Sequence, residues 1–362
     1  MNERIRLRQA WLVLVAACCL ANVARAADSA VVLLYHHVAA DTPRSTSITP
    51  ALFGMQLDYL AAEGFHVWPL LRVLEDLRDR RPLPDKTVAI TFDDAYVSIL
   101  TRALPELKRH GWPFTVFVST DAIDRKYGAF LSWRQLRQLA AAGATIGDHS
   151  LTHPHLLARE PGESDRDWAK RVRREIAGAR RRIAAEMGPA AIPVFAYPYG
   201  EYDRELEKIV GSIETFAVGQ QSGAVGVGSD LLAAPRFPMS TGYDSLAQFA
   251  LKVRVRPLPV TVLAPSGHVL ADGESLPQLH LQLGAGHYRI GELACYASGQ
   301  GRIIVDWVDR PARKLIVRPR KPLRPGRTKY NCTAPSNKVD GVFYWYSYLW
   351  MKKNPDGSWY NE

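Results

Sequence analysis

Short apolar runs alternate with amphipathic stretches along the first two thirds of the chain. The apolar runs have the length of buried strands, and the stretches between them carry apolar residues at helical spacing. The strand-like runs include VVLLYHHV (31–38), FHVWPL (65–70), TVAITF (87–92), FTVFVST (114–120) and ATIGDH (144–149). The helix-like stretches include PALFGMQLDYLAAEG (50–64), LRVLEDLRDR (71–80) and SWRQLRQLAAAG (132–143). The alternation predicts an α/β domain of parallel strands covered by helices, either closed as a barrel or open as a sheet.

The pattern changes after residue 256. The chain then shows short β-like runs broken by Gly and Pro, such as PVTVLA (259–264), LHLQLG (279–284) and GRIIVDWV (301–308). We therefore expect an α/β domain over residues 27–256, followed by a small all-β sandwich or barrel over residues 257–362. The aromatic run FYWYSYLW (343–350) either packs a core or presents its rings to sugars, so carbohydrate binding is one expectation for this second domain.

The first residues have the three parts of a secretory signal peptide. Basic residues at 4, 6 and 8 precede an apolar run over residues 11–20, and Ala24-Arg25-Ala26 follows as a cleavage site, so we expect residues 1–26 to be removed. An alternative is a lipobox, Val15-Ala16-Ala17-Cys18, in which Cys18 becomes a lipid anchor. Both predict a periplasmic or secreted protein. No later stretch reaches the roughly 20 apolar residues that a membrane-spanning helix needs.

The charge of the chain bears on its possible partners, and its cysteines bear on its compartment. The formal net charge of +10 suits attraction to anionic envelope polymers, or merely keeps the protein soluble. The most basic stretch, residues 166–182, has the helical spacing of a solvated helix face, so we expect no nucleic-acid partner. Loss of the leader leaves Cys295 and Cys332, which predict one disulfide in an oxidising compartment. Their Cα atoms should then lie about 4.4 to 6.8 Å apart.

Two adjacent carboxylates, Asp93 and Asp94, come directly after the strand-like run TVAITF. Adjacent acids repel each other unless another charge offsets theirs, and a bound cation does this well. One carboxylate can then ligate the cation while the other stays free as a general base. Taken alone, the pair is also compatible with a polar turn.

Two histidines, His149 and His153, follow the strand-like run ATIGD at a spacing of four residues. Two imidazoles and one carboxylate around a divalent ion leave positions open for water and substrate, which is the arrangement of a hydrolytic site. His155 is a competing ligand because it is two residues away. The sequence therefore predicts a metal site formed by His149, His153 and one of the two adjacent carboxylates.

Two further strand ends carry groups that suit the same chemistry. His36 and His37 close the first strand, and a histidine there can titrate near neutrality and protonate a leaving amine. The two side chains point to opposite faces of a regular strand, so only one of them should enter the site. The turn after VFAYPYG (194–200) can aim a backbone N–H at a developing oxyanion.

Taken in order, TFDD, HSLTH and YPYG resemble the first three motifs of the polysaccharide deacetylases of carbohydrate esterase family 4, over residues 30–250. The resemblance implies a distorted (β/α) barrel of about seven strands. It also implies that Asp93 is the general base, that Asp94, His149 and His153 hold a divalent metal ion, and that the Tyr199 N–H helps to form the oxyanion hole. Zinc is the first choice of metal, with cobalt, nickel or iron as alternatives.

The chain departs from the family pattern at two points. The family usually has an arginine two residues before the proline of its third motif, where this chain has Ala196. Arg236, near a later strand end, is our candidate replacement for orienting Asp93. The LxH motif that supplies the acid is missing from the end of the domain, whereas LLYHHV precedes TFDD. This order is similar to the circularly permuted branch that deacetylates poly-β-1,6-N-acetylglucosamine, and it makes His36 the expected acid.

We therefore expect an exported, metal-dependent hydrolase that removes acetyl groups from a polysaccharide containing N-acetylglucosamine. The expected substrate is an exopolysaccharide, and envelope or export machinery is a further expected partner. One alternative is the same chemistry on peptidoglycan or another acetylated glycan, because substrate choice resides in loops. Another is a non-catalytic carbohydrate-binding or export-assembly protein that keeps the barrel as a scaffold. Metal content distinguishes this last alternative from an enzyme.

Overall fold

The computed structural model describes residues 26–361. The expected signal peptide, apart from Ala26, and the expected lipidation site at Cys18 lie outside the described residues. Within residues 26–361, no helix is both long enough and apolar enough to cross a membrane.

The first part of the chain forms a curled sheet whose central strands are parallel. The order of strands is β11 (Phe216–Val218), β10 (Ala191–Ala196), β9 (Ala144–Asp148), β8 (Phe114–Val118), β7 (Thr87–Phe92), β2 (Ser29–Tyr35) and β12 (Ala224–Gly226). Two short strands pair with this path, β13 (Phe237–Pro238) with β2 and β5 (His66–Val67) with β7. Between residues 26 and 361, no strand pairing joins β11 to β12, so the sheet is a half-barrel. The predicted distorted (β/α) fold is confirmed.

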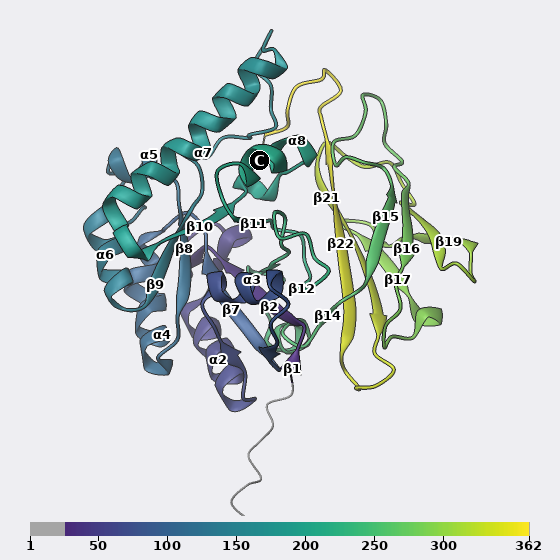
Figure 1. Ribbon diagram of the computed structural model, residues 1–362, viewed down its shortest axis with the longest axis horizontal. Coiled ribbons are helices and arrows are strands. Elements are labelled where there is room, and N and C mark those ends of the chain that lie inside the picture. Colours follow the sequence, from purple (N-terminus) through teal and green to yellow (C-terminus); the bar gives the residue numbers. More distant parts are fainter. Residues whose placement is uncertain (1–25, 362) are drawn as a thin grey trace, which may run out of the picture.

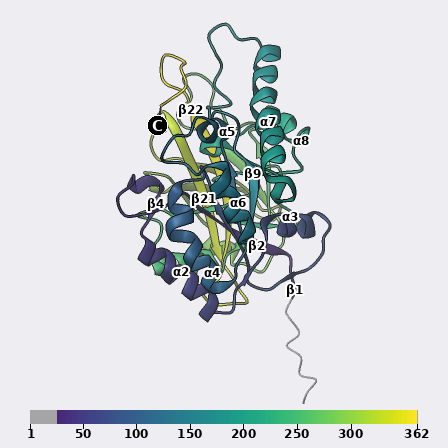
Figure 2. The same ribbon diagram turned by 90° about the vertical axis from the view of Figure 1, so that its left-hand side faces the viewer.

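The half-barrel is buried on both faces, as expected for parallel strands. Val31, Leu33 and Tyr35 of β2 pack into one apolar cluster and Ala30 and Val32 into another, because successive side chains of a strand alternate between faces. Figures 1 and 2 show the helices ranged around the sheet. They are α2 (Pro50–Ala62), α3 (Leu70–Arg78), α4 (Leu104–His110), α5 (Thr120–Asp124), α6 (Trp133–Ala141), α7 (Asp165–Met187), α8 (Arg204–Gly211) and α9 (Leu246–Lys252).

Helix boundaries follow local sequence signals. The Ser132 hydroxyl and the Gln135 side chain form a capping box at the start of α6, which lies in the helix-like stretch 132–143. The basic stretch lies in α7, whose buried side chains include Val172 and Ile176, so it is an amphipathic helix with a solvated basic face. The run FHVWPL was expected to be a strand, but only β5 forms. Pro69 lacks an N–H for strand pairing and serves as the N-cap of α3.

The last part of the chain is a sandwich of two antiparallel sheets over one apolar core. One sheet has the order β14 (Arg256–Pro257), β22 (Phe343–Lys352), β21 (Gly326–Pro335), β17 (Ala294–Ala297) and β18 (Gly301–Arg302). The other has the order β15 (Val260–Ala264), β16 (Leu279–Leu283), β20 (Lys314–Arg318) and β19 (Ile304–Asp309). The short strand β14 pairs with β22 in parallel, whereas β22 with β21, β21 with β17 and β17 with β18 are antiparallel. The predicted all-β region after the barrel is thus confirmed.

A disulfide joins Cys295 to Cys332 within this core, as predicted. The two residues are direct partners on the neighbouring strands β17 and β21. Their Cα atoms are 4.0 Å apart, slightly less than the expected range of about 4.4 to 6.8 Å. The Cα atoms of direct cross-strand partners are usually about 4.5 to 5.5 Å apart, so this pair is closer than ordinary strand pairing alone would place it.

The hairpin of β21 and β22 connects the sandwich to the half-barrel. Figure 1 shows these two long strands on the side of the sandwich that faces the half-barrel. Tyr348 and Trp350 point into the sandwich core, whereas Trp345 packs edge-on against Phe237 of the half-barrel at a ring separation of 5.3 Å. The terminal aromatic run therefore packs two cores, in agreement with the first of its two expected roles.

Candidate active site

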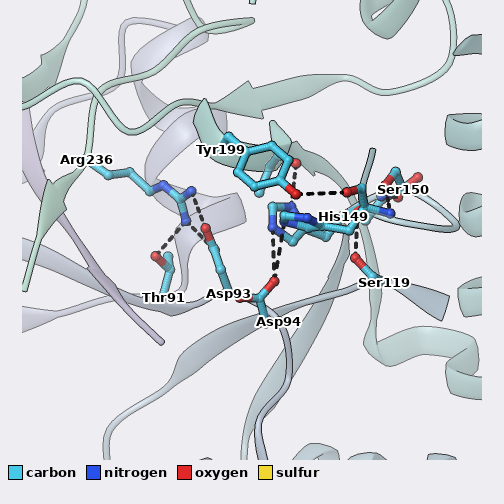
Figure 3. A network of polar contacts seen from close by, with 11 residues as sticks. Thr91, Asp93, Asp94, Ser119, His149, Ser150, Tyr199 and Arg236 are labelled. Carbon is cyan, nitrogen blue, oxygen red and sulfur yellow. Dashed lines mark hydrogen bonds and ion pairs between the residues drawn. The ribbon is translucent and has the colours of Figure 1, made fainter. Parts of the chain in front are cut away.

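Four parallel strands of the half-barrel bring most of the predicted residues to one edge. His36 follows β2, Asp93 and Asp94 follow β7, His149 follows β9, and Tyr199 lies in the turn after β10. Because these strands are parallel, their carboxyl ends meet at the same edge of the sheet. Figure 3 shows how closely the side chains gather there.

Asp94, His149 and His153 form a group whose ligand atoms all lie within 4.8 Å of one another. The Nε2 atoms of both histidines are 3.5 Å from Oδ1 of Asp94. Atoms that each lie about 2.0 to 2.2 Å from one tetrahedrally coordinated ion are roughly 3.3 to 3.6 Å apart. The spacing and chemistry of the three side chains thus fit a divalent ion such as zinc.

The protonation of both histidines also suits metal binding. The Nδ1 atom of His149 is 2.7 Å from the carbonyl oxygen of Ala196 and donates to it, so Nε2 is the ring nitrogen directed toward Asp94. Burial, reinforced by the nearby His149, lowers the pKa of His153 to about 4, although Asp94 and Asp93 oppose this shift. At neutral pH His153 is therefore the uncharged imidazole that a metal requires.

His155 lies outside this ligand group. Its ring stacks on Tyr199 at a separation of 3.9 Å, and its Nδ1 atom is 3.0 Å from a carboxylate oxygen of Glu201. The Tyr360 hydroxyl donates to the other oxygen of Glu201 at 2.6 Å, which ties the end of the chain to this part of the half-barrel. His155 thus supports the wall of the site and is not a ligand in this geometry.

Asp93 forms a two-pronged ion pair with Arg236. The guanidinium Nη1 and Nη2 atoms donate to the two carboxylate oxygens at 2.7 and 2.8 Å, and both side chains are fully buried. Arg236 is itself fixed by hydrogen bonds to the Thr91 hydroxyl at 3.1 Å and to the Gly219 carbonyl at 2.8 Å. Arg236, the candidate for the arginine expected before Pro198, therefore reaches Asp93 from the position just before β13. Figure 3 shows its guanidinium group facing the Asp93 carboxylate.

The charge of Asp93 depends on this arginine. Burial alone raises the pKa of the carboxyl group, but the positive charge of Arg236, with help from His149 and the Arg236 hydrogen bonds, outweighs it. The net result lowers the pKa of Asp93 from 3.8 to about 2. Asp93 is consequently ionised at neutral pH, as a general base must be.

The backbone around the site is held in an uncommon conformation. Asp94, His153 and Tyr199 have φ angles of 68°, 57° and 58°, in the left-handed region that residues other than glycine seldom adopt. Such conformations cost about 1 to 3 kcal/mol each and cluster at functional sites, where surrounding contacts enforce them. Here they turn the chain sharply at the strand ends, so that side chains from separate loops converge.

His36 and His37 occupy different surroundings. His36 lines the cavity beside Asp94, and burial lowers its pKa although Asp94 and Asp93 partly counteract this effect. His37 begins β3 (His37–Val38) and stacks on Tyr96 at a ring separation of 3.5 Å. The structure thus brings His36, and not His37, to the wall of the cavity that Asp94 and His153 line.

The cavity has a volume of about 1020 Å³, at the upper end of typical ligand pockets. Asp94, His153 and Tyr199 line its half-barrel side. Its other side is formed by residues of β21 and β22, among them Arg327 and Lys329, which the sequence reasoning did not include. The one available signal was that polar residues alternate with apolar ones along β21, and this cannot reveal what the polar face meets.

Comparison with known proteins defines the class of this domain as a hydrolase that removes acyl groups. Residues 80–216 match the family model described as polysaccharide deacetylase, and this segment contains Asp93, Asp94, His149, His153 and Tyr199. This segment, which is less than half of the chain, is therefore similar to the polysaccharide deacetylases. Arg236 and His36 lie outside the matched segment.

Individual relatives agree with this assignment. The chain is 27% identical to the poly-β-1,6-N-acetyl-D-glucosamine N-deacetylase of Escherichia coli (strain K12), over 49% of this chain and 32% of that enzyme. It is 24% identical to YxkH of Bacillus subtilis (strain 168), over 60% of this chain and 73% of the relative. The chain thus spans about a third of the Escherichia coli enzyme.

Solved structures show the same fold. The structure of IcaB from Ammonifex degensii superposes with a TM-score of 0.55 at 26% identity, over 63% of this chain and 97% of that one. The Streptococcus pyogenes deacetylase PplD, solved with acetate, also gives a TM-score of 0.55, at 22% identity over 62% of this chain and 98% of that one. Both matches leave more than a third of this chain without a counterpart.

Proposed function

We propose that this chain is an exported, metal-dependent N-deacetylase that hydrolyses acetamide groups of a polysaccharide containing N-acetylglucosamine. The observation that carries the proposal is the convergence of Asp94, His149 and His153 next to the ion pair of Asp93 and Arg236. The Escherichia coli relative, by its name, acts on a polymer of N-acetylglucosamine, which supports this choice of substrate.

Asp94, His149 and His153 would hold the ion, with zinc preferred for a set of two nitrogens and one oxygen and cobalt, nickel or iron as alternatives. When bound, a divalent ion supplies a Lewis acid that polarises a carbonyl group and makes water more acidic. The low pKa of Asp93 keeps its carboxylate ionised and able to accept a proton at neutral pH, although it is a weak base.

The remaining steps belong to the protein's own groups. Asp93 accepts a proton from the attacking water as the new carbon–oxygen bond forms, and the Tyr199 N–H donates to the oxyanion. His36 then protonates the nitrogen as the carbon–nitrogen bond breaks, acting as the general acid. The products are acetate and a sugar amine.

Export is supported by the leader-like sequence of residues 1–26 and by the disulfide, which is typical of oxidising compartments. We place the protein in the periplasm or outside the cell, where it would meet an exopolysaccharide and its envelope or export machinery. A lipid anchor at Cys18 is the alternative to release as a soluble enzyme.

The decisive experiment measures acetate release by the metal-loaded protein from N-acetylglucosamine oligomers, peptidoglycan fragments and O-acetylated glycans, each with and without a chelator. We expect release from the N-acetylglucosamine oligomers, loss of release with the chelator, and recovery when zinc is restored. Faster release from peptidoglycan or O-acetylated glycans would show that this glycan, and not the N-acetylglucosamine polymer, is the preferred substrate. A purified protein that binds no divalent ion would favour the non-catalytic scaffold.

A further inference from the structure

The sandwich supplies a polar wall to the cavity. Alternate residues of β21 point into opposite environments, as in any strand. Tyr330 and Cys332 face the sandwich core, whereas Arg327, Lys329 and Asn331 line the cavity. The same cavity is lined by Asp94 and His153 of the candidate metal site, so groups from the sandwich face whatever occupies that site.

Positive charge predominates among the described residues that line the cavity. Four of them are cationic and two are acidic. The cationic side chains are Arg125, Lys252, Arg327 and Lys329, and the acidic ones are Asp94 and Asp121.

Both acidic side chains already have partners. Asp94 belongs to the candidate metal site, and Asp121 forms an ion pair with Arg125 at 3.0 Å. By contrast, among residues 26–361 no carboxylate forms an ion pair with Lys252 or Lys329. The Lys329 ammonium donates to the Gln220 carbonyl at 2.9 Å, and the Lys252 ammonium donates to the Tyr243 carbonyl. Each ammonium has three donors, so both keep capacity for a ligand.

The two lysines lie in an environment that disfavours their charge. Burial lowers the pKa of Lys329 to about 8, and the nearby Arg327 and Lys252 add to this effect. Burial also lowers the pKa of Lys252 to about 8, against the opposing effect of Asp244. An anion bound beside them would offset the repulsion among like charges.

We propose, on the basis of the proposed deacetylase function, that Lys329 and Arg327 of the sandwich wall, together with Lys252 of α9, select an acidic polysaccharide. A carboxylate or phosphate on a sugar adjoining the acetylated one would accept hydrogen bonds from Lys329 and Lys252, with Arg327 adding positive charge. Charge-assisted hydrogen bonds of this kind are shorter and stronger than neutral ones. A polymer of neutral sugars would gain nothing from these cations, and the amines left by deacetylation would be repelled by them.

The test compares three kinds of oligosaccharide with the full, metal-loaded chain. The first alternates N-acetylglucosamine with a hexuronic acid, the second is its carboxyl-reduced form, and the third carries a phosphodiester between the sugars. The reduced form keeps the shape and removes only the charge. We expect kcat/KM for the carboxylate or the phosphodiester oligomer to exceed that for the reduced form by roughly 10- to 100-fold, the range for hydrogen bonds to charged groups. Which of the two anionic oligomers is preferred identifies the acidic group.

A pair of matched variants assigns the preference to the wall. Lys329→Gln should lower the ratio of kcat/KM between anionic and reduced oligomers about tenfold, mainly through KM. Lys352→Gln is the control, because Lys352 also lies on the β21–β22 hairpin and donates to a backbone carbonyl, that of Leu323, but is not among the residues lining the cavity. It should keep the ratio of the native protein. Thermal unfolding of both variants checks that neither change disrupts the fold.

Binding of the same oligomers, measured by calorimetry, needs no turnover and separates the two proposals. If the protein releases acetate from every oligomer and binds all of them equally, the acidic-polymer inference is wrong and the deacetylase function stands. If it binds anionic oligomers more tightly but never releases acetate, the proposed function fails and the anion-selective wall remains. A Lys329→Gln variant that keeps the full preference for anionic oligomers would also overturn the inference.

Discussion

The two sides of the cavity are built on different principles. On the half-barrel side, functional groups follow the ends of parallel strands, and left-handed backbone turns at Asp94, His153 and Tyr199 fix their directions. On the sandwich side, Arg327, Lys329 and Asn331 project from regular positions along one antiparallel strand.

This difference suggests a division of labour. Chemistry on an amide needs atoms placed to within about 0.5 Å, which rigid strand ends supported by further hydrogen bonds can provide. Recognition of a neighbouring sugar tolerates looser placement, and side chains on one face of a strand can be exchanged without altering the core behind them. Variants on the half-barrel side should therefore change mainly kcat, and variants on the sandwich side mainly KM.

The largest expected effect is on activity, and it distinguishes His36 from the neighbouring His37. His36→Ala should reduce deacetylation by roughly 10² to 10⁴-fold, the usual contribution of a positioned acid or base, and should leave metal content unchanged. His37→Ala should do far less, because His37 stacks on Tyr96 and does not line the cavity. Turnover of both variants on one N-acetylglucosamine oligomer at matched metal occupancy makes the comparison. The reverse order would make His37 the acid, and equal activity of both variants would place the acid elsewhere.

The next effect concerns the ion pair of Arg236 and Asp93. Arg236→Met should lower the free energy of unfolding by about 3 to 5 kcal/mol, because it leaves a buried carboxylate without its partner. The double variant Arg236→Met with Asp93→Asn should lose less stability than Arg236→Met, since the unpaired charge is gone. Urea unfolding at pH 7 of the native chain, of the single variants Arg236→Met and Asp93→Asn, and of the double variant measures these losses. Additive losses in the double variant would show that the pair is not coupled.

The ion pair of Asp93 and Arg236 also predicts that the stability of the protein depends on pH. The folded-state pKa of Asp93, about 2, lies below its ordinary value of 3.8. Its contribution to stability is therefore fully present above the ordinary value and is lost as the pH falls from about 4 toward 2. Asp93→Asn should flatten the stability profile in this acidic window, relative to the native chain.

Much of the half-barrel could be predicted from the sequence, because its strands are short apolar runs whose ends carry polar motifs. Parallel strands bring their carboxyl ends together, so the meeting of Asp94 with His149 follows from topology despite their separation in sequence. The pairing of Arg236 with Asp93 could be predicted only with the family pattern as well. That pattern has an arginine where this chain has Ala196, so another arginine was expected to take its place.

The sandwich wall could not be predicted in the same way. Its strands and its disulfide follow from local pattern and composition, but its position against the half-barrel depends on contacts between distant segments. Trp345 meets Phe237, and Lys329 meets Gln220, through packing that no motif encodes. The antiparallel pairing of β12 with β2 was missed for the same reason, since a strand of three residues leaves almost no periodic signal.

The smallest effect in this series is expected for the disulfide, and it tests whether the sandwich serves mainly binding. Removing the link between Cys295 and Cys332 should lower the free energy of unfolding by about 2 to 4 kcal/mol, the usual range for a bridge closing a loop of this size. Unfolding of the native chain with and without reductant measures this without changing a side chain.

In the variant Cys295→Ala with Cys332→Ala, loosening of β17 against β21 should disturb the cavity wall at Lys329 more than the strand ends of the half-barrel. We therefore expect KM for the preferred oligomer to rise several-fold while kcat changes little. A fall in kcat at constant KM would show instead that the sandwich holds the catalytic groups in place, and the division of labour between the two sides would be wrong.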